Sequence, residues 1–185
     1  MALETAVGTI STAEDLLGTT IANSTYFLTF SGEAAVAQAL NRVHFGALPP
    51  PANGSDEYTI AELSYLRPFV VVFVSPTDTI RYSRTASGNR YDANGTVIAW
   101  FERDVPDGMN YAEAERSWNN TIGKILKQTT ETDPFDGVLD QADVADRITV
   151  NRCTVRELYR APEEDISSNG DYQRAVVEFE WGPIA

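Results

Sequence analysis

The chain has 185 residues, of which 43% are hydrophobic, so it is long enough for one domain with a proper buried core. Its formal charge is −13 at pH 7. A charge of this sign argues against tight, non-specific binding to nucleic acid, because such binding depends on Lys and Arg side chains that neutralise phosphates.

The basic residues are almost all arginine, since Lys occurs only at positions 124 and 127 among the 14 basic residues. The planar guanidinium group makes several directed hydrogen bonds, and Arg is enriched at protein–protein interfaces. A genome rich in G and C would favour Arg codons in the same way. The composition is therefore compatible with an interface protein but does not prove one.

The N-terminal part of the chain predicts a flexible arm followed by helices. Residues 1–10 form the expected arm. Ser11 and Glu14 have the spacing of a capping box, in which each side chain bonds the backbone amide of the other. A helix is therefore expected from Ser11, and the segment Tyr26–Phe30 is either the end of this helix or a short strand. A second, Ala-rich helix is expected over Glu33–Val43.

A proline-rich segment, residues 47–57, is expected to be a long loop. Its three successive prolines favour an extended polyproline conformation, and Asn53-Gly54 favours a turn. The loop either projects as a partner-binding arm or crosses an edge of the sheet. The segment Tyr58–Leu66 alternates in character and predicts a strand, which Pro68 separates from the next one.

Two apolar segments predict the middle of a sheet. The run Val70–Val74 is β-branched or aromatic throughout, which favours a buried strand. Residues 96–103 return as a second strand, with Val97, Ala99 and Phe101 on one face. Asn94-Gly95 lies just before this strand and predicts a tight turn, because both residues tolerate positive φ.

Between these two strands the chain is expected to form an exposed hairpin, residues 76–95. Basic and aromatic residues alternate in it, at Arg81, Tyr82, Arg84, Arg90 and Tyr91. Such a pattern can stack on nucleic acid, but the net charge disfavours that function. Arg and Tyr are also enriched at interface hot spots, so we predict that these five residues contact a neighbouring subunit. An ordinary hairpin without a partner fits the pattern equally well.

The clearest helical periodicity covers Tyr111–Thr129, and Trp118 is expected to anchor this helix on the sheet. An Asp-rich segment, residues 132–147, follows. Its carboxylates recur at steps of three and four residues, which does not fit the alternating ligands and distal Glu of an EF-hand loop. We therefore expect no metal site there.

Two strands are expected to complete the domain as an antiparallel hairpin. They cover about Ile148–Tyr159, where Cys153 would be half buried, and Tyr172–Trp181. The second strand alternates strictly, and its core-facing residues would be Ala175, Val177, Phe179 and Trp181. The order of elements predicts an α+β fold, in which a mostly antiparallel β-sheet with flanking α-helices forms a single domain over residues 11–185.

Chemistry-bearing motifs are scarce in this sequence. His44 and Cys153 are the single residues of their types, which leaves no His-rich metal centre, redox pair or disulfide framework. The sequence contains no nucleophile elbow, phosphate-binding loop or dinucleotide-binding glycine motif. His44 near the expected helix end is interpreted as a capping or packing residue. We therefore expect a protein that is not an enzyme and needs no metal or cofactor.

The N-terminus lacks the basic and apolar segments of a signal peptide. No apolar run approaches the roughly 20 residues that a membrane-spanning helix needs. We therefore expect a protein that folds in a reducing cytoplasm and has no membrane partner.

The succession of N-terminal helices, FVVVFV, an exposed hairpin, TVIAWFERDVP, an amphipathic helix and VVEFEWG resembles the tail terminator proteins of tailed bacteriophages. The resemblance covers roughly Ala34 to Trp181. These proteins are also called tail completion or head–tail joining proteins. In that family an α+β domain assembles into a hexameric ring, which caps the tail tube, stops its polymerisation and receives the head connector. The longer N-terminal part and the three-proline loop depart from the family pattern.

The resemblance implies a virion structural protein at the head–tail junction, or neck, that is assembled in the host cytoplasm. Its expected partners are further copies of itself in a homohexamer ring, the tail tube protein, and the head connector or neck protein. DNA would pass through an acidic lumen without specific binding, because like charges repel. The predicted hairpin and the loop 47–57 would contact other subunits or the tail tube.

A different class of function remains open at this point, namely a monomeric or dimeric ligand- or peptide-binding domain without catalysis. Such a domain would use exposed Tyr and Trp residues and would show a concave aromatic surface. An enzyme would instead show a pocket with converging carboxylates of perturbed pKa.

Overall fold

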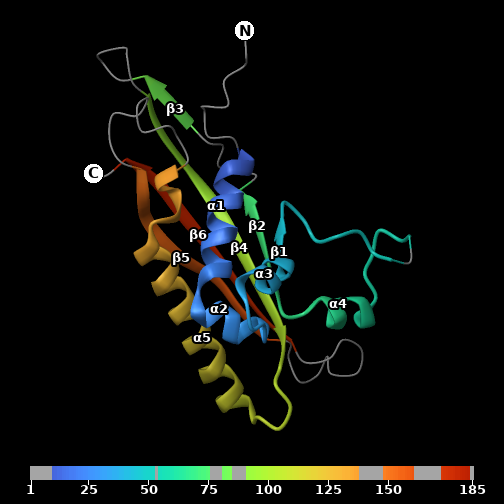
Figure 1. The fold of residues 1–185 in the computed structure, drawn as a ribbon. Coiled ribbons are helices and arrows are strands. Elements are labelled where there is room, and N and C mark those ends of the chain that lie inside the picture. Colours follow the sequence, from blue (N-terminus) through green and yellow to red (C-terminus); the bar gives the residue numbers. More distant parts are fainter. Residues whose placement is uncertain are drawn as a thin grey trace.

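A six-stranded β-sheet with helices packed on one face forms the body of the protein (Figure 1). The computed structural model describes residues 10–52, 54–75, 81–84, 91–137, 148–160 and 172–183. Five strands follow the order β1-β2-β4-β6-β5, and β3 pairs with β4 outside this row. The β1–β2 pair is parallel and the other described pairs are antiparallel. The predicted α+β class, with a mostly antiparallel sheet in a single domain, is confirmed.

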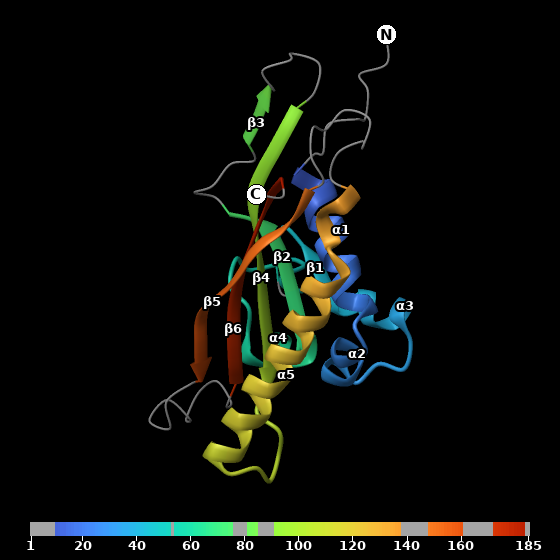
Figure 2. The same cartoon turned by 90° about the vertical axis from the view of Figure 1, so that its left-hand side faces the viewer.

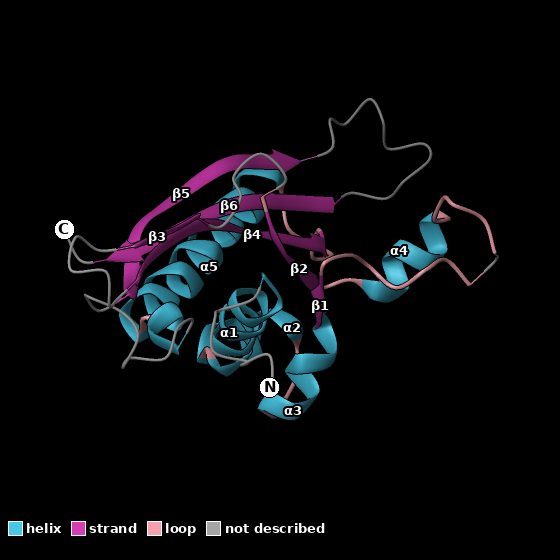
Figure 3. Ribbon diagram, turned by 90° about the horizontal axis from the view of Figure 1, so that it is seen from above, coloured by secondary structure: helices cyan, strands magenta, loops and turns pink. Residues whose placement is uncertain are grey.

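The strands are β1 (Val43–Phe45), β2 (Phe69–Val74), β3 (Arg81–Arg84), β4 (Tyr91–Asp104), β5 (Ile148–Arg160) and β6 (Tyr172–Pro183). The helices are α1 (Ile10–Asn23), α2 (Thr25–Ser31), α3 (Val36–Ala39), α4 (Ile60–Leu66) and α5 (Tyr111–Thr132), with short 3-10 helices at Leu40–Arg42 and Pro134–Gly137. Figures 2 and 3 show α1, α2 and α5 on the same face of the sheet. The opposite face is called the open face below.

The core lies between the sheet and helices α1, α2 and α5. Alternate residues of the three central strands point to this side and are buried: Val70, Val72, Val97, Ala99, Phe101, Ala175, Val177, Phe179 and Trp181. Trp118 of α5 is 2% exposed and packs against the ring of Phe30, with the ring centroids 6.0 Å apart. The predicted core positions of β6 and the predicted common face of Val97, Ala99 and Phe101 are therefore confirmed. Trp118 also contacts the sheet as predicted, because the Arg103 guanidinium of β4 lies 5.0 Å from its ring centre.

Helix α1 begins at Ile10, so the predicted capping box at Ser11 is wrong, because Ser11 lies inside the helix. Glu14 has a tertiary partner instead, since its carboxylate Oε1 accepts a hydrogen bond of 2.9 Å from the backbone N–H of Val74. The side chain thereby ties α1 to the end of β2. Of the predicted arm, residues 1–9 lie outside the described residues.

The segment Tyr26–Phe30, left open between strand and helix, belongs to a separate helix, α2, which Ser24 caps. The prediction of one helix over Glu33–Val43 is wrong in its extent. Helical turns end at Arg42, and the chain continues as β1, which places His44 in a strand. Pairing of β1 with β2 supplies backbone hydrogen bonds that outweigh the helical propensity of the Ala-rich sequence.

Two further predictions are contradicted by the structure. The segment predicted as a strand over Tyr58–Leu66 contains α4, because Thr59 and Glu62 form a complete capping box. Asn94-Gly95 makes no tight turn but lies within β4, where Asn94 pairs with Arg81 and Gly95 with Trp181. Strand pairing along both parts of β4 therefore overrides the local turn preference of this dipeptide.

The C-terminal half follows the sequence-based expectations closely. Helix α5 covers the predicted segment and begins with a capping box of Asn110 and Glu113. Strands β5 and β6 form the predicted antiparallel hairpin, and Cys153 is half buried. Most of the Asp-rich segment, residues 138–147, lies outside the described residues, whereas Asp133 accepts a hydrogen bond of 3.2 Å from the N–H of Val150.

Two helical glycines give a test of the packing between α1 and β1. A Cβ added at Gly18 would overlap the ring of Phe45 and lie 2.9 Å from Cγ1 of Val43, whereas one at Gly123 would meet nothing within 4 Å. We expect Gly123→Ala to raise the free energy of unfolding by about 0.5–1 kcal/mol, because Ala has the higher helix propensity. Gly18→Ala should lower it by about 1 kcal/mol or more through overpacking. Urea unfolding followed by circular dichroism measures both changes. Equal stabilisation by the two substitutions would show that α1 does not pack tightly on β1.

Candidate functional site

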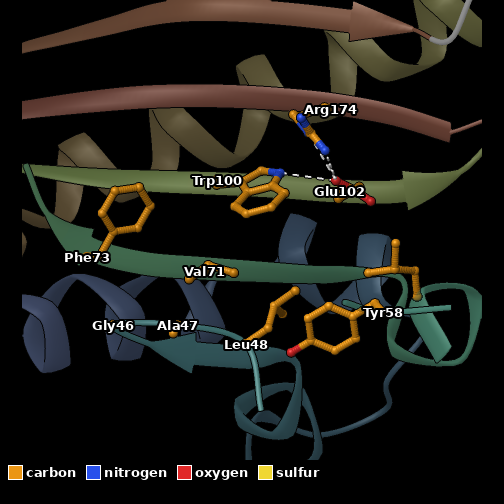
Figure 4. A pocket seen from close by; sticks show the side chains of 10 residues that line it. Gly46, Ala47, Leu48, Tyr58, Val71, Phe73, Trp100, Glu102 and Arg174 are labelled. Atoms are coloured by element: carbon orange, nitrogen blue, oxygen red, sulfur yellow. Dashed lines mark hydrogen bonds and ion pairs between the residues drawn. The ribbon is translucent and has the colours of Figure 1, made fainter. Parts of the chain in front are cut away.

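A pocket of about 470 Å³ lies on the open face of the sheet (Figure 4). Its floor consists of Val71 and Phe73 from β2 and Trp100 from β4. These residues alternate with the core residues of the same strands, so the pleat directs them to the open face. Val71 and Trp100 are direct cross-strand partners. The ring of Phe69 meets Trp100 edge to face, with 5.9 Å between centroids, and fixes the indole from the side.

One wall of the pocket comes from the segment between β1 and β2. We call residues 46–52 and 54–66 the wing, because Figure 1 shows them extending beyond the β1 edge of the sheet. Gly46 starts the wing with a φ of 74°, a conformation that favours glycine, and its N–H donates to the Val72 carbonyl over 2.8 Å. The Tyr58 hydroxyl donates to the Pro49 carbonyl, which joins two ends of the proline-rich loop. Leu48, Tyr58 and Leu63 thereby face the sheet across the pocket.

A cluster of charged residues, here called the Glu102 cluster, forms the polar end of the pocket. Glu102 is 1% exposed, and both of its carboxylate oxygens are occupied. Oε1 accepts hydrogen bonds from Nε and Nη2 of Arg67 at 2.8 and 2.6 Å. Oε2 accepts from the Trp100 indole at 3.2 Å and from Nε of Arg174 at 3.1 Å. Four donors on one carboxylate compensate the cost of burying its charge.

The Glu102 cluster also holds the wing against the sheet. Arg67 lies directly after α4, and its Nη1 donates to Asp104 over 2.9 Å. Ser64 of α4 donates to the other oxygen of Asp104 over 3.1 Å. The Arg67 guanidinium lies 4.6 Å from the centre of the Tyr172 ring, which adds a contact to β6. Rigid attachment of the base of the wing follows from these contacts.

The geometry of the Glu102 cluster limits its chemistry. A carboxylate that accepts from two guanidinium groups and an indole has no oxygen left to take a proton from a substrate. Asp104 is likewise engaged by Arg67 and Ser64. At the pocket the cluster therefore offers the guanidinium of Arg174, whereas the carboxylate of Glu102 is fully engaged.

The predicted interface residues lie at the other end of β4. Arg81, Tyr82 and Arg84 are in β3 and Tyr91 begins β4, where Arg84 pairs with Tyr91 across the strands. The structure describes the backbone of these four residues but not their side chains, and Arg90 lies outside the described residues. A subunit contact of this hairpin therefore stays a prediction.

The sequence reasoning missed the Glu102 cluster. Its partners are 35 and 72 positions from Glu102 along the chain, and no short-range motif connects them. The one available signal was a charged residue at the end of the apolar run Val97–Phe101, on the same face as Trp100. Such a residue in a central strand requires partners from neighbouring strands.

The single histidine and the single cysteine are both partly buried. The His44 ring meets Phe69 edge to face at 6.0 Å, and burial together with the nearby Arg42 lowers the pKa of His44 below its ordinary value. Burial raises the pKa of Cys153 to about 11, so its thiol is protonated at neutral pH.

Within the described residues, no group of three His, Cys, Asp or Glu side chains could hold a metal ion. In the same part of the chain no helix combines the length and apolar character needed to cross a membrane.

Comparison with known proteins gives no assignment. The chain matches no model of a protein family, and no curated protein matches it. The grounds for a function are therefore the α+β fold, its projecting elements and the pocket.

Substitution of Glu102 tests whether its cluster holds the fold together. We expect Glu102→Gln to lower the free energy of unfolding by about 3 kcal/mol, because two guanidinium groups lose their counter-charge and the amide cannot accept at both positions. Urea unfolding followed by tryptophan fluorescence measures this change. The matched control is Glu180→Gln, whose partner Arg152 lies 4.0 Å away with both side chains exposed. That change should cost less than about 1 kcal/mol. A small, equal effect of the two substitutions would contradict a structural role of the cluster.

Proposed function

We propose that this protein is a virion structural protein of tailed bacteriophages, of the tail terminator type. It forms a ring at the head–tail junction, where it caps the tail tube and joins it to the head connector. The proposal combines the resemblance in sequence pattern with the arrangement of two projecting surfaces. It requires no catalytic residue, metal or cofactor.

The observation that carries this proposal is the presence of two different projections at opposite ends of the sheet. Residues 91–94 of β4 pair with β3 and residues 95–104 with β6, so the β3–β4 arm extends past the body of the sheet (Figure 2). Figure 3 shows the wing beyond the opposite end. A subunit that closes into a ring by head-to-tail contacts needs two different, complementary surfaces. An arm and a wing on one subunit can supply them.

The wing has the features of a prepared interface. Tyr65 of α4 is 84% exposed, which is unusual for a large aromatic residue with no role in the core. Tyrosine is enriched at interface hot spots, where it adds contact area at a low cost in conformational entropy. The contacts of Arg67 and Ser64 to the sheet hold α4 in place before any partner binds. Less ordering is then needed on association.

Charge complementarity supports the same arrangement. The arm carries Arg81 and Arg84, while the chain as a whole has a charge of −13. An arginine-bearing arm would therefore meet an acidic neighbour, which sets the register between subunits. The same acidic surface around a lumen would let DNA pass without specific binding.

The proposed partners are further copies in a hexameric ring, the tail tube protein and the head connector or neck protein. The proposed location is the virion, and assembly would take place in the host cytoplasm. No membrane partner is proposed.

Native mass is the direct test of this function. Light scattering of the purified protein, followed by negative-stain images at high concentration, should reveal closed rings of about six subunits. A monomeric preparation is next mixed with purified tail tubes, which can act as a template for the ring. Protein that neither forms rings nor binds tail tubes would contradict the proposal.

A second candidate function is favoured by the pocket. A monomeric or dimeric ligand- or peptide-binding domain without catalysis would use a concave aromatic surface, and Tyr58, Phe73 and Trp100 line such a surface here. This candidate gains support if the protein remains a monomer or dimer and does not bind tail tubes.

The arm can be tested by removing its positive charges. We expect the triple variant Arg81→Ala, Arg84→Ala and Arg90→Ala to lower the ring fraction at a given concentration, because hot-spot arginines carry a large share of binding energy. The melting temperature should stay near that of the wild type. The control removes the same charge elsewhere, through Arg116→Ala, Arg152→Ala and Arg156→Ala. Unchanged rings in the arm variant would exclude the arm from the interface.

The wing is tested by Tyr65→Ala, with Tyr26→Ala as the matched control. Tyr26 is 42% exposed on α2, where the Lys124 ammonium lies 5.5 Å from its ring centre. Loss of a central aromatic contact should weaken self-association or tube binding by about tenfold or more. Sedimentation velocity over a concentration series measures this change. Equal behaviour of the two variants would contradict a contact through the wing.

A further inference from the structure

We propose that the pocket on the open face binds a small organic carboxylate with an aromatic body. This inference concerns a ligand and does not depend on the ring. The pocket volume of about 470 Å³ lies within the range of roughly 300–1,000 Å³ that is typical of small-molecule sites. The ligand class follows from the two parts of the lining, which are an apolar floor and wall and a single polar end.

The apolar part selects a flat, hydrophobic body. Phe73 and Trp100 on the floor and Tyr58 on the wall present ring surfaces around the pocket (Figure 4). Aromatic groups prefer offset-stacked and edge-to-face contacts with such rings. The floor is fixed before binding, because Trp100 is held by Phe69 at its edge and donates its indole N–H to Glu102. A rigid ring therefore enters without reordering these side chains.

The polar end selects a negative charge. Both oxygens of Glu102 already accept from two donors each, so a cationic ligand would find no free carboxylate there. Arg174 directs Nε and Nη2 to Glu102, both at 3.1 Å, and no described side chain accepts a hydrogen bond from its Nη1. The Arg174 side chain is 31% exposed and lines the pocket. This guanidinium nitrogen is the donor available to a ligand.

The charges around Arg174 point the same way. Glu102 is shared by two guanidinium groups, those of Arg67 and Arg174. Arg67 has a second carboxylate, Asp104, as a partner. Among the described carboxylates, Arg174 has only its share of Glu102, so its positive charge is incompletely compensated at the pocket. Its guanidinium carbon also lies 4.6 Å from the centre of the Trp100 ring and 5.4 Å from that of Tyr172. A carboxylate placed against Nη1 would complete the compensation through a charge-assisted hydrogen bond.

The preference for a carboxylate is tested with three probes of one shape: 2-naphthoate, 2-naphthamide and 2-naphthylmethylammonium. Isothermal titration calorimetry at low salt measures their affinities for the wild-type protein. We expect 2-naphthoate to bind about tenfold or more tightly than the amide, and the ammonium probe to bind most weakly. Equal affinities, a preference for the cation, or no binding of any probe up to about 10 mM would overturn the proposal.

Variants then locate the binding site. Arg174→Gln should lower the affinity for 2-naphthoate about tenfold, to that of the amide, while leaving amide binding unchanged. Arg174→Lys keeps a positive charge and should retain part of the preference for the carboxylate. This variant is needed because Arg174→Gln also removes a hydrogen-bond partner of Glu102, which could weaken binding by itself. Arg152→Gln removes an equally charged, 65% exposed side chain from the neighbouring strand and should change nothing.

Filling the pocket gives the decisive control. Ala47→Phe and Leu63→Trp place a ring in the space that a ligand would occupy, and each should abolish binding of 2-naphthoate. Circular dichroism establishes that both variants are folded. Undiminished binding to both folded variants would overturn the assignment to this pocket. Native mass is read on the same samples, so failure of the ligand proposal is distinguishable from failure of the ring proposal.

Discussion

The buried carboxylate of Glu102 is the constraint on which the arrangement of the open face depends. A charge that is 1% exposed persists only with full hydrogen bonding, and its donors come from Arg67, Trp100 and Arg174. These residues belong to the base of the wing, to β4 itself and to β6. One carboxylate therefore joins the wing to the sheet, orients the indole on the pocket floor and positions the guanidinium at the polar end.

The two faces of the sheet differ in what covers them and in the residues that they carry. The face covered by α1, α2 and α5 is apolar and closely packed, as the space around Gly18 illustrates. The open face carries the pocket and the charged residues, while the arm and the wing extend from opposite ends of the sheet. Projections on a rigid platform are a common way for proteins to present binding surfaces.

The proposed assembly and the proposed ligand share one structural element. Leu48, Tyr58 and Leu63 of the wing form a wall of the pocket, and Tyr65 of the same wing is the exposed aromatic residue for which we propose a subunit contact. A ligand that changes the position of the wing would therefore change the affinity between subunits, and assembly would change the affinity for the ligand by the same factor. The two proposals rest on separate observations, but the structure makes their coupling measurable.

Local sequence patterns by themselves determined the elements with strong periodicity. The strict alternation of β6 and the amphipathic stripe of α5 each require burial of one side in any compact fold. The unbroken apolar run of β2 requires burial of both faces, as its first four residues show. The α+β class follows from their order. Weak or conflicting local signals were decided by tertiary structure. Pairing with β2 made Val43–Phe45 a strand, and pairing with β3 and β6 kept Asn94-Gly95 extended.

The segment Tyr58–Leu66 differs from these cases, because its capping box was readable in the sequence. The alternating pattern of its residues predicted a strand, but the segment pairs with no strand and forms a helix instead. The Glu102 cluster and the pocket had no comparable signal. Their residues come from four segments, and only the register of β2, β4 and β6 brings Val71, Trp100, Glu102 and Arg174 together. A one-residue shift of that register would turn these side chains to the other face, so the site exists only as a consequence of the strand pairing.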